Sequence, residues 1–60
     1  MRHCTGESIN VYETHGRNLA PLLEEAAKQL EELDGEFAYA SVDTFLDSEL
    51  SEYVVVLYVH

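Results

Sequence analysis

The chain has 60 residues with 12 Asp and Glu against 3 Lys and Arg, which gives a formal net charge of −9. This length allows one small domain, residues 1–60, whose core alone gives marginal stability. The single cysteine excludes an internal disulfide, and no apolar run approaches the roughly 20 residues that span a bilayer. The N-terminus also lacks the apolar segment of a signal peptide, so we expect a cytoplasmic protein.

The negative charge is concentrated in the C-terminal two thirds of the chain. Residues 1–18 balance two Arg against two Glu, whereas residues 19–60 hold ten acids and a single base, Lys28. Such acidity disfavours binding to nucleic acids and anionic membranes, because both depend on Lys and Arg. Two interpretations stay open: the acids provide solubility or adaptation to salt, or they form a surface that docks on a basic partner protein.

The N-terminal third predicts an arm, a strand and a turn. Residues 1–8 (MRHCTGES) have neither helical nor strand periodicity, so we expect a loosely ordered arm. Residues 9–14 alternate apolar and polar positions, which predicts a short half-buried strand. His15, Gly16 and Arg17 are expected to form the turn that follows.

Residues 19–33 predict an amphipathic helix. The apolar positions, spaced by three and four, are Leu19, Leu22, Leu23, Ala26, Ala27, Leu30 and Leu33. Asn18 is the expected N-cap, Pro21 suits the first turn, and Gly35 is the expected C-terminal cap. The outer face carries Glu24, Glu25, Lys28, Glu31 and Glu32. We expect Lys28 to be shared between Glu24 and Glu32, because each lies four residues away.

Two strands are predicted after the helix. Residues 36–46 alternate aromatic and small side chains, which favours a strand packed on both faces, and Asp47, Ser48 and Glu49 favour a turn. Residues 53–59 (YVVVLYV) are apolar on both faces, as in a covered central strand. We therefore predict an α+β fold of the order β-α-β-β, with one helix on a three-stranded antiparallel sheet of strand order 1-3-2.

One helix covers only one face of that sheet. The uncovered apolar face predicts a homo-oligomer assembled sheet on sheet or edge to edge. The expected interface residues are Tyr39, Val54, Val56 and Tyr58. The alternative is a monomer in which the N-terminal arm covers this face.

The element order supports two resemblances. Residues 11–33 (VYETHGRNLAPLLEEAAKQLEEL), with EFAYASVD and EYVVVLY, resemble small sporulation-associated proteins of about sixty residues. The final strand also looks like that of dodecins, the flavin-storage shells, which implies the same topology and an oligomer. Dodecins carry a flavin-stacking Trp after the helix and a Gln in the last strand, where this chain has Gly35 and Val54. We therefore expect no flavin and no other cofactor.

The turn before the helix is the candidate ligand site. Its residues His15, Gly16, Arg17 and Asn18, with Tyr12 nearby, place cations at a helix N-terminus, which attracts anions. A nucleotide-like anion held there, at an interface between protomers, is one functional hypothesis. The structural alternative is that Arg17 pairs with an acid such as Glu13 and that His15 is a surface residue.

The other chemistry-bearing side chains predict no metal site and no catalytic site. His3, Cys4, His15 and His60 lack zinc-ligand spacing, and Cys4 lacks an orienting acid, so we expect a free thiol and no enzyme. The favoured hypothesis is an acidic oligomer that binds a basic protein and regulates or inhibits it. The expected docking residues are Glu24, Glu25, Lys28, Glu31 and Glu32. Small acidic phage proteins that disarm bacterial defences share this character, so an anti-defence role is one form of the hypothesis.

Overall fold

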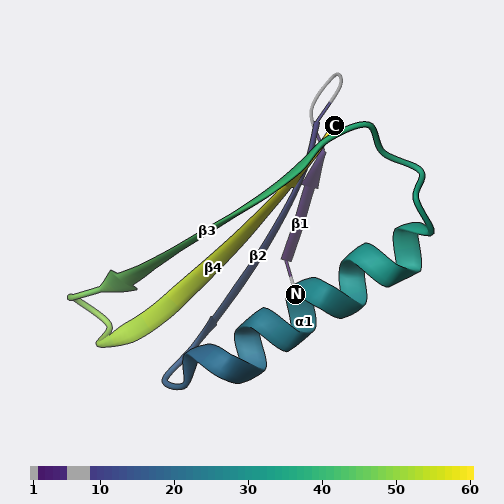
Figure 1. Cartoon of the computed structure of the whole chain (residues 1–60). Coiled ribbons are helices and arrows are strands. Elements are labelled where there is room, and N and C mark those ends of the chain that lie inside the picture. Colours follow the sequence, from purple (N-terminus) through teal and green to yellow (C-terminus); the bar gives the residue numbers. More distant parts are fainter. Residues whose placement is uncertain (1, 6–8) are drawn as a thin grey trace.

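The computed structural model describes residues 2–5 and 9–60. These residues form β1 (Arg2–Thr5), β2 (Asn10–Gly16), α1 (Leu19–Leu33), β3 (Ala40–Asp47) and β4 (Glu52–Val59). The strands make one antiparallel sheet in the order β1-β2-β4-β3, with α1 along one face (Figure 1). The α+β class and the antiparallel sheet are confirmed. The prediction of three strands is wrong, because the N-terminal segment adds a fourth strand beside β2. The three predicted strands keep their predicted order 1-3-2, as β2-β4-β3.

β1 is held by backbone pairing and by one aromatic stack. His3 lies opposite Tyr12 in the register, and their rings stack with centroids 4.3 Å apart and planes 7° from parallel. The Nε2 atom of His3 also lies 3.0 Å from Oδ1 of Asn10. The predicted arm therefore contributes an edge strand through residues 2–5. Its residues 1 and 6–8 lie outside the described part of the chain.

β2 is longer than predicted, because His15 and Gly16 belong to the strand and not to a turn. Only Arg17 and Asn18 connect it to α1. The φ angle of Gly16 is not positive, so the backbone conformation at this position does not require glycine. What matters here is that glycine has no side chain. A Cβ atom at this position would lie 3.1 Å from Cδ2 of Leu22, and the missing side chain lets the first turn of the helix pack closely on β2.

The predicted helix bounds are confirmed, since α1 begins at Leu19 and ends at Leu33. These are the first and last apolar residues with the spacing of three and four. The buried stripe is narrower than expected: Leu22 and Ala26 are buried, whereas Leu23 and Ala27 are exposed. Asn18 occupies the N-cap position in an extended conformation, but its side chain makes no capping hydrogen bond. The expectation of a side-chain cap is therefore wrong. Burial of the stripe, and not capping, stabilises this end of the helix.

Two successive left-handed residues end α1, and they give opposite predictions. Asp34 has φ 49° and donates its backbone N–H to the Glu31 carbonyl at 3.0 Å, and Gly35 follows with φ 77°. Asp34→Gly relieves the strain of a left-handed side chain, so we expect a gain of about 0.5–1 kcal/mol in the free energy of unfolding. Gly35→Ala introduces the same strain, and we expect a loss of about 1 kcal/mol. Urea unfolding of both variants tests the pair, and two shifts of the same sign would contradict it.

The core lies between α1 and the two middle strands. Towards the start of the helix, Leu22 and Ala26 pack with Val55 of β4. Towards its end, Leu30 and Leu33 pack on a cluster of Tyr12, Leu57 and Val59. A helix about 10 Å across covers about two strands spaced about 4.8 Å apart. Accordingly α1 contacts β2 and β4, and β3 lies beyond it (Figure 1).

β4 confirms the prediction of a strand covered on both faces, since Val54, Val55, Val56 and Leu57 are all buried. β3 does not meet the expectation for residues 36–46. It begins at Ala40, because Phe37 packs against the core cluster of the helix and β4. Most of its side chains are exposed, so the prediction that this strand is packed on both faces is wrong.

The hairpin turn between β3 and β4 includes the predicted turn residues Ser48 and Glu49, whereas Asp47, also predicted in the turn, is the last residue of β3. The Asp47 carboxylate accepts the backbone N–H groups of Glu49 and Leu50, at 3.0 and 3.3 Å. Ser51 then takes a left-handed conformation with φ 53°. This self-bonded turn fixes the register of β3 on β4.

Candidate functional site

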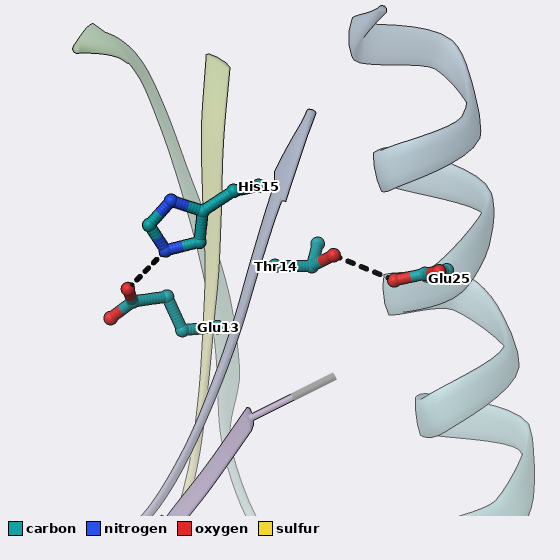
Figure 2. Close-up of polar contacts among 4 residues, drawn as sticks. All are labelled: Glu13, Thr14, His15 and Glu25. Carbon is teal, nitrogen blue, oxygen red and sulfur yellow. Dashed lines mark hydrogen bonds and ion pairs between the residues drawn. The ribbon is translucent and has the colours of Figure 1, made fainter. Parts of the chain in front are cut away.

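The turn predicted to bind an anion is divided between the two faces of the sheet. His15 and Glu13 point to the face opposite α1, and Nε2 of His15 lies 2.6 Å from Oε1 of Glu13 (Figure 2). Among residues 2–5 and 9–60 this is the one ion pair, when the imidazole is protonated. The predicted pairing of Glu13 with Arg17 is therefore replaced by a pairing with His15.

The remaining residues of that candidate site do not converge with His15. Tyr12 points to the helix side, where it is 7% exposed and stacked on His3. Arg17 and Asn18 are exposed in the connection to α1. An anion near His15 would face the Glu13 carboxylate, which repels it. This geometry is better suited to a local surface ion pair than to sequestration of an anion.

The predicted docking residues on α1 fall into two groups. Thr14, 8% exposed, donates its hydroxyl to Oε2 of Glu25 at 2.7 Å, so Glu25 joins the helix to β2 (Figure 2). The other four, Glu24, Lys28, Glu31 and Glu32, are exposed on the outer side. The expected sharing of Lys28 between two acids is absent from the ion pairs of the described residues. These charges are therefore open to water or to a partner.

The four predicted interface residues differ in accessibility. Val54 and Val56 are 3% and 7% exposed within the single chain. In the register, each lies between one β2 side chain and one β3 side chain, as Val54 does between His15 and Phe45. Lateral cover by neighbouring strands therefore removes much of the apolar area expected on this face. Tyr58 is half-buried, and Tyr39 is 59% exposed with its ring edge-on to His60.

Besides Tyr39, the most exposed large apolar side chains lie on and beside β3, where the sequence pattern gave no indication of them. Phe45 is 52% exposed, Leu46 59% and Leu50 57%. The smaller contributions come from Val42, Tyr53 and, on the helix, Leu23. Leu23 lies on the flank of α1 away from Glu25, which is the flank toward β3, since successive helix residues turn by about 100°. We call Val42, Phe45 and Leu46 the β3 patch. Val42 and Leu46 lie on the helix side of β3, and Phe45 lies on its other face.

The candidate metal and thiol residues are dispersed. His3 and Cys4 lie on opposite faces of β1, His15 pairs with Glu13, and His60 follows β4. No three His, Cys, Asp or Glu side chains of residues 2–5 and 9–60 gather to form a metal site. The same residues enclose no pocket.

In the described part of the chain no helix combines the length and the apolar character that crossing a bilayer requires. No protein-family model, curated protein or solved structure matches this chain. The resemblances to sporulation-associated proteins and to dodecins therefore stay predictions.

Proposed function

We propose that this chain is a small acidic interaction protein that works as a homo-oligomer and regulates or inhibits a partner protein. The partner has a basic surface, on which the outer face of α1 docks. The observation that carries this proposal is the arrangement of Glu24, Glu31 and Glu32, which lie exposed on α1 without an intramolecular ion pair among the described residues. Complementary charge across an interface sets the association rate and the choice of partner.

The two sides of the molecule suit different contacts. The outer face of α1 is charged, and the β3 patch is apolar. In protein interfaces an apolar centre provides most of the affinity, and charges at the rim provide orientation and specificity. We assign the β3 patch to assembly and the helix face to the partner. Protein binding of this kind needs no pocket and no cofactor.

The test compares two variants with equal change of charge. The first replaces Glu24, Glu31 and Glu32 by Gln, and the control replaces Glu36, Glu49 and Glu52 by Gln. We expect the first to reduce capture of a basic protein from a lysate of the source cells by about tenfold or more, because opposite charges on the docking face are lost. The control should retain capture, and about 0.5 M salt should weaken capture by the unaltered chain.

The result that contradicts docking through α1 is equal capture by the two variants. Capture that does not respond to salt contradicts it as well. Once a partner is isolated, its own activity is measured with the unaltered chain and with both variants. Regulation requires that the effect on that activity is lost together with binding.

A further inference from the structure

The outer edge of β3 presents unpaired backbone groups. Tyr39 and His60 exchange both of their backbone hydrogen bonds, at 3.3 and 2.9 Å. In an antiparallel pair such bonded pairs alternate with non-bonded pairs. Continued along the β3–β4 register, the alternation directs the N–H and C=O groups of Val42, Thr44 and Leu46 away from β4. In the described sheet no strand lies on that side.

Apart from the carboxylates of Asp43 and Asp47, this edge lacks the features that usually protect an edge strand. It is eight residues long and holds no Lys and no Pro, whereas β1 at the other edge has four residues and includes Arg2. The β3 patch adds exposed apolar side chains on both faces of this edge, with Val42 and Leu46 on the helix side and Phe45 on the other. A strand that pairs with this edge would cover part of each face.

We propose that a second copy of this chain occupies the edge, with β3 pairing antiparallel to β3 about a two-fold axis at Thr44. The inference rests on the proposed function only in taking the protein to be a homo-oligomer, and it names the interface. Both sheets then join into one sheet with the two α1 helices on the same face. The three outward-facing residues of each copy give about six backbone hydrogen bonds across the axis.

Charge and side-chain pairing select this register. The two-fold axis is perpendicular to the joined sheet and keeps each side chain on the same face as the side chain opposite it. The axis must therefore lie midway between one residue of β3 and the same residue of the second copy. An axis at Asp43 sets that carboxylate against its own copy, and an axis at Phe45 sets Asp43 against Asp47 of the second copy. Like charges directly opposite each other destabilise a sheet. Axes nearer to either end of β3 shorten the ladder.

The axis at Thr44 avoids both repulsions. It places Val42 opposite Leu46 of the second copy, which brings together two side chains that are 42% and 59% exposed in the single chain. This pair occurs twice, once on each side of the axis. Apolar cross-strand pairs of this kind stabilise antiparallel sheets.

The net charge makes the salt dependence of assembly differ in sign from that of partner docking. Each copy carries −9, so two copies repel each other over a distance that salt shortens. We expect the dimer to become tighter as salt increases, whereas docking of the acidic helix on a basic partner becomes weaker. Failure of one proposal therefore leaves the other measurable.

Analytical ultracentrifugation at low salt and at about 0.5 M salt tests the edge. We expect a dimer for the unaltered chain and a monomer for Thr44→Pro, because proline removes an outward N–H group that β4 does not use. Val42→Lys with Leu46→Lys should also give a monomer, which provides a second variant if the proline prevents folding. Leu50→Lys, outside the ladder, is the control and should retain the dimer.

Cross-linking tests the register directly in a Cys4→Ser background. Across the axis, Thr44 of the two copies has a Cα separation of about 5.5 Å, within disulfide range. Val42 of the two copies is about 14 Å apart, since four residue steps separate them. Oxidation should therefore link the chains in Thr44→Cys and leave Val42→Cys as single chains. A monomer at both salt concentrations, a dimer that Thr44→Pro leaves intact, or equal cross-linking of the two cysteine variants overturns the proposal.

Discussion

Leu57→Ala is expected to remove most or all of the stability of the fold. Leu57 is fully buried in the centre of β4 and belongs to the cluster with Tyr12 and Val59. Truncation of a buried Leu to Ala costs about 3 kcal/mol, because it removes apolar contacts and leaves a cavity. A core in a chain of this size rarely supplies more than about 5 kcal/mol. Urea unfolding followed by circular dichroism measures the loss.

Leu50→Ala is the matched control, since the same substitution falls on a side chain that is 57% exposed in the hairpin turn. We expect it to change the free energy of unfolding by less than about 0.5 kcal/mol. Both variants are measured at one protein concentration, because assembly adds stability that depends on concentration. Similar losses for the two variants would show that the core is not centred on β4.

The helix and the central strand could be predicted because each has a signal contained within its own residues. Leu22, Ala26 and the neighbouring apolar residues are spaced by three and four, which fits an α-helix and does not fit a strand. Similarly, the run around Val55 is too apolar for an edge strand. Each pattern indicates that a face is buried without indicating which element covers it. Both predictions therefore hold even though the predicted number of strands is wrong. This is why the position of β4 in the sheet could be predicted together with the bounds of α1.

β1 could not be predicted, because its residues carry no periodic pattern. Its order comes from backbone pairing with β2 and from the stack of His3 on Tyr12. Both contacts join β1 to residues of another strand, so a search for periodicity within residues 1–8 does not detect them. A short polar strand at an edge needs neither apolar alternation nor β-branched residues.

The exposed apolar residues lie on β3 and not at the predicted interface residues Val54 and Val56, and the reason is geometric. Apolar alternation in β3 indicates a strand, but it does not indicate whether one helix reaches over it. Because α1 covers about two strands, Val42 and Leu46 stay exposed on the helix side, whereas Val54 is covered laterally by its neighbours. The exposed apolar area therefore lies on the edge strand and not on the middle of the open face. The location of the exposed apolar area therefore depends on how many strands the helix can cover, and not on residue type.

Thr14→Val is the second large expected effect, because it removes the one side-chain hydrogen bond between sheet and helix in the described residues. The Thr14 hydroxyl donates to the Glu25 carboxylate at 2.7 Å from a position that is 8% exposed. Valine keeps the shape of the side chain and removes the donor. Hydrogen bonds to charged groups contribute about 1.5–3 kcal/mol, and partial hydration of Glu25 places the expected loss near the lower value, about 1.5 kcal/mol. Thermal and urea unfolding measure it.

A double-mutant cycle separates this bond from the general acidity of α1. Glu25→Ala should cost about as much as Thr14→Val, and the two together should cost little more than either alone, with a coupling of about 1 kcal/mol. Glu24→Ala, a neighbouring acid without such a bond in the described residues, is the control and should change stability by less than about 0.5 kcal/mol. Additive losses would mean that Thr14 and Glu25 do not interact in solution. Because Glu25 is engaged with β2, Glu25→Gln should leave capture of a basic partner unchanged, whereas substitution of Glu24, Glu31 and Glu32 should reduce it by about tenfold or more.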